Sequence, residues 1–263
     1  DGIASRGLGD VYKRQTASNS LGVGTDVLAA ETTGHTNTGF GYHALKALTA
    51  GTNCVAVGQR ALESVTTTGF SVAVGANALQ KMTTSYNNVA VGYEALRETT
   101  TGGNNTAIGR SALVMNTTGS QNVACGQLVL EENTTGSNNT ASGYEALHSN
   151  TTGADNVAVG YRALKSNTTG NKNIAIGEGA MPDNTAGVSN IGIGVDTLYF
   201  NSTGGYNVAI GEQALRANTT SYNVGVGYQA LLGNTSGSNN TATGASALRN
   251  NTTGADNTAV GYN

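Results

Sequence analysis

Side chains that could carry out chemistry are few in this sequence and do not recur together. The three histidines, His35, His43 and His148, lack the spacing of a metal-binding motif, so they are expected at surface or corner positions. No Ser/His/Asp set recurs along the chain, and Asp, Arg and Lys do not gather at regular positions as in catalytic β-helices. The sequence therefore predicts a protein that is not an enzyme and holds no metal.

Two glycine-rich stretches, GFGYHA from Gly39 and GIGVD from Gly192, are similar to the phosphate-binding loop of dinucleotide-binding proteins. Such a loop needs a helix directly after it and an acidic partner further along, and neither follows in place. Both stretches are copies of a pattern that fills the chain. We therefore expect no nucleotide and no other cofactor.

Tyrosines that follow a recurring glycine are the most notable candidates for surface binding. They are Tyr42, Tyr93, Tyr144, Tyr161, Tyr228 and Tyr262. Stacked tyrosines could bind a sugar or a protein, with Tyr93, Tyr144 and Tyr161 as the candidate residues. The favoured interpretation is simpler, namely that the rings cover a glycine corner.

The pattern behind these motifs is a 17-residue repeat anchored on one glycine. The spacing from Gly24 to Gly41 recurs without change as far as Gly211, is shorter by a single residue up to Gly227, and then returns to its full length up to Gly261. The result is fifteen copies with one single-residue deletion, which falls within residues 219–223. Since loops absorb changes in length, this part of each copy is predicted to be a loop.

Each copy is interpreted as one coil of a β-solenoid. Val or Ile usually stands one residue before the anchor, Val, Ile or Thr three before it, and Ala or Gly between them, which is the alternation of a β-strand. Leu stands four residues after the anchor in thirteen copies and Met181 in one, and Asn-Thr-Thr-Gly or a near variant supplies a turn. Because one coil cannot bury its own apolar side chains, the coils must stack. The prediction is an all-β parallel β-roll or β-solenoid of about fifteen coils, each with two short strands, a glycine corner and a polar turn.

In the central copies, two sets of equivalent residues are expected to stack in columns along the solenoid. They are the corner glycines Gly92, Gly109, Gly126, Gly143, Gly160 and Gly177 and the core leucines Leu96, Leu113, Leu147 and Leu164. An Asn also opens the strand in twelve of the fifteen copies, as Asn156 does, and stacked Asn side chains are expected to form a hydrogen-bonded ladder.

The small residue in the middle of the strand suggests that several chains pack together. If Val and Ile face the interior with Leu, the Ala/Gly column faces outward, and a strand that is apolar on both faces is buried on both. Close contact with another chain is therefore expected at Ala90, Ala107, Ala124, Ala141, Ala158 and Ala175.

Composition excludes several classes of partner. Charged residues make up 11% of the chain and the net charge is −3, so there is no basic surface for nucleic acid. No run of eighteen apolar residues exists, so no membrane insertion is expected of this segment. Cys54 and Cys125 occupy different columns four copies apart, roughly 19 Å at about 4.8 Å per coil, so no disulfide is expected between them.

Residues 1–15 do not fit the repeat. DVYKRQ, from Asp10 to Gln15, resembles the translation of a sequencing-transposon adapter, and the favoured interpretation is a read-through artefact rather than a divergent lead-in. Residues 16–263 are then a single repeat domain, expected to be a fragment truncated at both ends.

The repeat NVAVGYRAL, with its relative NTAIGRSAL, resembles the YadA-like head repeats of trimeric autotransporter adhesins and related repeats of phage tail fibres. The resemblance covers about residues 20–263, although the 17-residue period is longer than usual and the NTTG turn is additional. It implies a left-handed β-roll and a homotrimer, located outside the cell on a bacterial surface or a virion. A host-surface glycan or protein would be a further partner.

Two functions remain open at this stage. The favoured one is a structural and adhesive rod, in which the number of repeats sets the length. The alternative is a monomeric ice-binding solenoid, which needs a flat Thr-x-Thr face. Thr241 and Thr243 provide this pattern in one coil, but Val or Ile takes both positions in most others.

Overall fold

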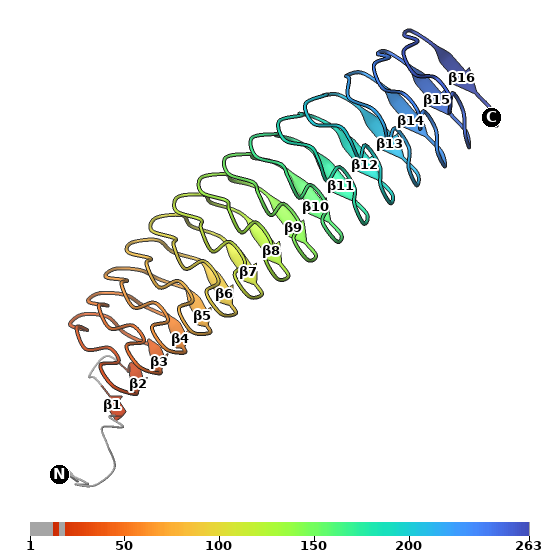
Figure 1. The fold of residues 1–263 in the computed structure, drawn as a ribbon. Helices are drawn as coiled ribbons and strands as arrows, with labels where there is room; N and C mark the ends of the chain where they lie inside the picture. Colours follow the sequence, from red (N-terminus) through yellow and green to blue (C-terminus); the bar gives the residue numbers. More distant parts are fainter. Residues whose placement is uncertain (1–12, 16–18, 263) are drawn as a thin grey trace, which may run out of the picture.

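The computed structural model describes residues 13–15 and 19–262, which form one elongated stack of coils (Figure 1). Within this part of the chain every regular element is a three-residue β-strand, and no helix is present. The strands are β1 (Lys13–Gln15), β2 (Leu21–Val23), β3 (Thr38–Phe40), β4 (Val55–Val57), β5 (Val72–Val74), β6 (Val89–Val91), β7 (Thr106–Ile108), β8 (Val123–Cys125), β9 (Thr140–Ser142), β10 (Val157–Val159), β11 (Ile174–Ile176), β12 (Ile191–Ile193), β13 (Val208–Ile210), β14 (Val224–Val226), β15 (Thr241–Thr243) and β16 (Thr258–Val260).

The parallel β-solenoid is confirmed, because each strand from β2 to β15 pairs in parallel with the strand that follows it. Partners are equivalent residues of neighbouring copies, so that Val91, Ile108, Cys125, Ser142 and Val159 form one column. Each coil has one strand rather than the two predicted, because tight turns take up the rest of its length. Of residues 1–15 the structure describes Lys13–Gln15, which pairs antiparallel with β2, and the remainder of that segment lies outside the described residues.

The single-residue deletion shortens a turn and leaves the strands in register, as predicted. Val208 of β13 pairs with Val224 of β14 across the shortened copy, and Val224 pairs with Thr241 across a copy of full length. The register therefore recovers within one coil.

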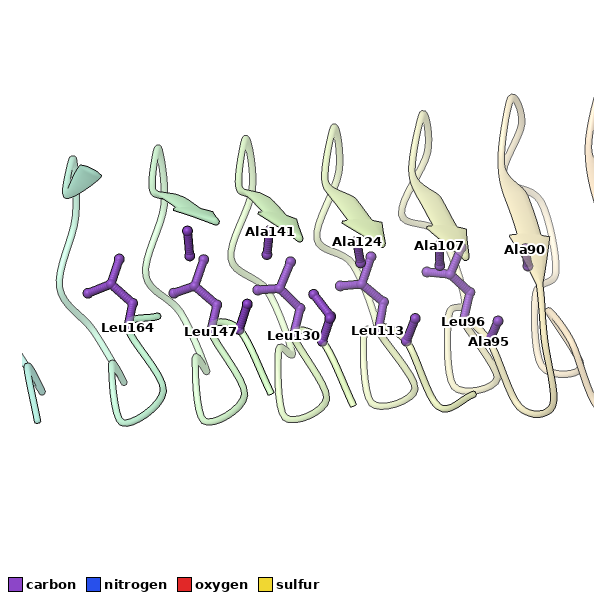
Figure 2. Packing of buried hydrophobic residues seen from close by; sticks show 14 of the residues in the cluster. Ala90, Ala95, Leu96, Ala107, Leu113, Ala124, Leu130, Ala141, Leu147 and Leu164 are labelled. Atoms are coloured by element: carbon purple, nitrogen blue, oxygen red, sulfur yellow. The ribbon is translucent and has the colours of Figure 1, made fainter. Parts of the chain in front are cut away.

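The prediction for the two faces of the strand was wrong. Ala90, Ala107, Ala124, Ala141, Ala158 and Ala175 are fully buried within the single chain. Figure 2 shows Ala107, Ala124 and Ala141 pointing at the leucine column across the interior of the coil. The flanking Val and Ile side chains face outward and are partly exposed. The alanines are therefore core residues and cannot be a contact between chains.

The interior is too narrow for a larger side chain at the alanine position. Where Gly225 takes this position, an added Cβ would lie only 3.2 Å from Cγ of Leu215. A methyl group thus fills the space opposite each Leu, and the core consists mainly of one Leu and two Ala per coil. Close packing of this kind leaves no room for Val or Ile.

Backbone conformation explains why the core column holds Leu or Met and never Val or Ile. These residues have positive φ in every coil, for example 51° at Leu147 and 51° at Met181. A β-branched side chain is strongly disfavoured in that left-handed region. The corner glycines are also confirmed in their role, because Gly160 has a φ of 135° and an added Cβ would lie 2.5 Å from the carbonyl oxygen of Gly177.

Buried asparagines form the predicted ladder along the strand entrance. Asn156 Nδ2 donates to Asn139 Oδ1 at 3.1 Å and to the Gly170 carbonyl at 2.8 Å, and Asn156 Oδ1 accepts from the backbone N–H of Asn173 at 2.9 Å. Each side chain thus satisfies backbone groups of its own coil and the next. Buried polar groups are tolerated only under such full pairing.

A second ladder runs through the NTTG turns of the later coils. Asn150 Nδ2 donates to Asn133 Oδ1 at 2.8 Å and to the Gly153 carbonyl at 2.9 Å. In earlier coils the same column is filled by Leu48, Val65 and Met82, which are also buried. The rod therefore has an apolar second core toward its N-terminus and an amide ladder toward its C-terminus.

Candidate interaction surface

The outward strand face is a long apolar surface that has no partner within the described residues of the single chain. We define it as the first and third residues of strands β4 to β16. Val or Ile takes most of these positions, and side chains such as Val159, Ile176 and Ile193 are between 36% and 39% exposed. With strands about 4.8 Å apart, the face is roughly 60 Å long and two side chains wide. An apolar surface of this length makes the face the candidate interaction site.

A few polar residues interrupt the outward strand face near its middle and toward its C-terminal end. Cys125, Thr140 and Ser142 lie in adjacent coils, and Thr241 and Thr243 lie in β15. The thiol of Cys125 is free and exposed on this face. Cys54 is also free, but it is buried, and desolvation raises the pKa of its thiol. The two cysteines therefore differ strongly in accessibility.

The predicted tyrosine residues lie beside the strand ends and are exposed. The rings of Tyr144 and Tyr161 stack with centroids 5.7 Å apart. Tyr93 is also exposed but stands three coils earlier, so the structure does not bring it together with the other two. Sequence reasoning missed a second group of exposed aromatic side chains in the turns before the strands. They are Phe70, Tyr86, Tyr206 and Tyr222.

A charged cluster next to Tyr144 and Tyr161 joins two coils. Glu145 accepts from Lys165 Nζ at 2.9 Å and from Arg162 Nε at 2.9 Å. The Arg162 guanidinium also lies 4.9 Å from the centre of the Tyr161 ring. The hydrogen bond from Lys165, supported by those from Tyr144 and Arg162, lowers the pKa of Glu145 to about 2.

Glu145→Gln should make the protein less stable at pH 7 but not at pH 2. A carboxyl whose pKa is lowered on folding stabilises the folded state above its ordinary pKa, and this contribution is lost as the pH falls from about 4.5 to 2. The expected loss at pH 7 is about 1 kcal/mol, because Arg162 and Lys165 are partly exposed and solvent screens them. Denaturant unfolding at pH 7, 4 and 2 measures the difference, and a constant difference across this range would contradict the assignment.

His43 and His148 lie beside carboxylates of neighbouring coils. His43 is buried at a corner, with Nδ1 2.9 Å from Glu63 Oε1 and Nε2 3.2 Å from Asp26 Oδ2. His148 Nε2 lies 2.7 Å from Glu131 Oε2. No group of three or more His, Cys, Asp or Glu side chains arranged to hold a metal ion occurs among residues 13–15 and 19–262. These contacts join neighbouring coils.

No protein-family model, curated protein or solved structure matches this chain. In the part of the chain that the structure describes, no helix is long and apolar enough to cross a membrane. The geometry of the solenoid itself is therefore the basis for any functional proposal.

Proposed function

We propose that this chain is a non-enzymatic structural rod that assembles with further copies of itself through the outward strand face. The observation that carries the proposal is the long column of partly exposed β-branched side chains on a stack of parallel strands. The proposed assembly is a left-handed homotrimer on a bacterial surface or a virion, as in trimeric adhesins and tail fibres. The exposed tyrosines are then candidate contacts for a host glycan or protein.

Repetition favours a second copy of this chain as the occupant of the outward strand face. A copy has the same spacing between coils, so its apolar columns can match this face over the full length, whereas a globular partner would cover a few coils. Three residues of strand are about 10 Å wide, so a face roughly 60 Å long offers about 600 Å² per copy. Aromatic and turn side chains along the border would bring this area close to that of a stable interface, which is about 800 Å² per partner.

Ile176→Lys with Ile193→Lys should abolish assembly and leave the coils folded. Both side chains lie on the outward strand face, where a buried ammonium group in an interface would lack a partner. Sedimentation is expected to show an oligomer for the unchanged chain and a monomer for the variant, with the same circular dichroism.

Thr152→Lys with Thr169→Lys is the matched control, because both threonines are exposed on the turns and the added charge is equal. This control should remain oligomeric.

A bis-maleimide should also link Cys125 of neighbouring copies if the rods run parallel and in register, whereas buried Cys54 should not react. An unchanged chain that sediments as a stable monomer would overturn the assembly.

The alternative is a monomeric ice-binding solenoid, and one observation favours it. The face that could order water points outward in the single chain, with Thr-x-Thr in β15 and Thr-x-Ser in β9. Most other coils present Val or Ile there, which favours burial in an assembly. A monomer that arrests ice growth would support the alternative.

A further inference from the structure

The single-residue deletion interrupts the hydrogen bonds that join neighbouring turns. The first Thr of a turn, such as Thr151, donates from its backbone N–H to the carbonyl of the corresponding residue in the next coil, here Thr168. Its side-chain hydroxyl donates to the same carbonyl oxygen, and both bonds recur in the coils from Thr32 to Thr235. Ser202 is the exception within this described range, because neither its N–H nor its Oγ reaches the carbonyl of Thr219. The turn at residues 201–204 is therefore not tied to the turn that follows.

The turn ladder of asparagines breaks at the same place. Oδ1 of Asn201 is buried and has no hydrogen-bond partner, whereas Oδ1 of Asn184 accepts from Asn201 Nδ2 at 3.2 Å. Asn218 Nδ2 keeps a bond to a carbonyl of its own turn, that of Thr220 at 2.8 Å, but makes no bond to Asn201 Oδ1. In the shortened turn this carbonyl stands two residues after the Asn, rather than three as between Asn201 and Gly204.

The strand side of the same two coils stays joined. The backbone N–H of Asn223 donates to Asn207 Oδ1 at 2.9 Å, and that of Tyr222 donates to the Gly205 carbonyl at 3.1 Å. The rings of Tyr206 and Tyr222 also stack at 5.2 Å. This coil interface is therefore closed at the strands and open at the turns.

We propose that residues 201–204 and 218–220 form a built-in point of local opening, at which this rod is first exposed to bending and proteolysis. In a stack where each coil contacts only its neighbours, the weakest interface opens first. Here one interface lacks three series of hydrogen bonds that its neighbours make. The buried Oδ1 of Asn201, which has no hydrogen-bond partner, weakens this interface further.

The chain contains a matched internal control. The sequence TTSYN occurs at residues 83–87, where a further Asn88 completes a full-length turn, and at residues 219–223, where no further Asn follows. In the full-length turn, Thr66 donates to the Thr83 carbonyl at 3.0 Å and Thr83 donates to the Thr100 carbonyl at 3.1 Å. Tyr86 and Tyr222 are both 58% exposed, so static exposure does not distinguish them.

Limited digestion of the full chain with chymotrypsin under native conditions tests the proposal. Cleavage after Tyr222 should be at least about fivefold faster than after Tyr86, since the loss of even one hydrogen bond typically changes an opening equilibrium by about that factor. Insertion of Asn between Tyr222 and Asn223 recreates the TTSYNN sequence of the full-length turn, and it should reduce cleavage after Tyr222 to the level of Tyr86. Deletion of Asn87 should make Tyr86 a fast site.

Hydrogen exchange supplies a second measurement that needs no variant. The amide of Ser202 should exchange faster than those of Thr185 and Thr235, which donate to the carbonyl of the next turn. Equal cleavage at the two tyrosines together with equal exchange would overturn the proposal, as would an insertion that leaves cleavage after Tyr222 unchanged. Both tyrosines belong to one chain, so this comparison is separate from the test of assembly.

Discussion

Asn156→Ala should destabilise the rod by roughly 3 kcal/mol, more than any substitution of an exposed polar residue. The change removes the acceptor of the Asn173 backbone N–H, which then lies buried without a partner. It also removes two hydrogen bonds from Asn156 Nδ2, to Asn139 Oδ1 and the Gly170 carbonyl. An orphaned buried donor costs about 1–3 kcal/mol and each further hydrogen bond contributes about 1 kcal/mol.

The repeat itself offers a graded comparison for this position. Ser71 occupies the same column, and its Oγ accepts from the Asn88 backbone N–H at 3.4 Å. Asn156→Ser should therefore retain part of the bond and cost less than Asn156→Ala. Thr152→Ala, on the exposed side of the turn, should change stability by less than about 0.5 kcal/mol.

Chemical denaturation of the three variants measures these differences. Hydrogen exchange should also locate the loss in the coils on either side of Asn156, because solenoid coils depend on nearest neighbours. Equal stability of the Ala and Ser variants would show that the acceptor role of the side chain is not what stabilises the ladder.

The repeat and its register could be predicted because they depend on spacing alone. An anchor glycine in every copy and a strand pattern before it require parallel pairing of equivalent positions once the coils stack. The loop at residues 219–223 and the strand-opening Asn ladder followed from the same columns. Each prediction used a property that the backbone fixes locally.

The direction in which the strand faces could not be obtained from alternation. A Val-Ala-Val strand is apolar on both faces, so its sequence does not show which face is buried in the core. The answer depends on the turn after the strand, where Gly160 at a φ of 135° and Leu164 at a φ of 51° bring the Leu side chain back toward the alanines. Those angles are a property of the folded coil.

The residue types found at the middle and outer positions of the strand nevertheless indicate which face is buried, once the coil is known. The middle position of the strand accepts Ala or Gly only, as expected where a wall of the same chain lies close by. The outer positions accept Phe40, Cys125 and Ser142 as well as Val and Ile, which is a range of sizes that a narrow core would not admit. Restricted size, rather than hydrophobicity, was the informative signal.

Ala124→Gln combined with Ala158→Gln should unfold the coils around β8 to β10 rather than separate intact chains. Both alanines are fully buried, and the leucine column leaves space for a methyl group only. Overpacking costs about 1–3 kcal/mol at each site, and a buried amide without partners adds about 1–3 kcal/mol. The two substitutions together should therefore cost at least about 4 kcal/mol.

Val159→Gln combined with Ile193→Gln is the matched control, because it introduces the same side chain on the other face of the strands. These positions are partly exposed in the single chain, so the coils should stay folded and only self-association should weaken. Circular dichroism on heating and sedimentation velocity separate the two effects. The opposite result would be an alanine variant that dissociates but stays folded, together with a control that unfolds. It would show that the alanines face outward and that Val159 and Ile193 face the core.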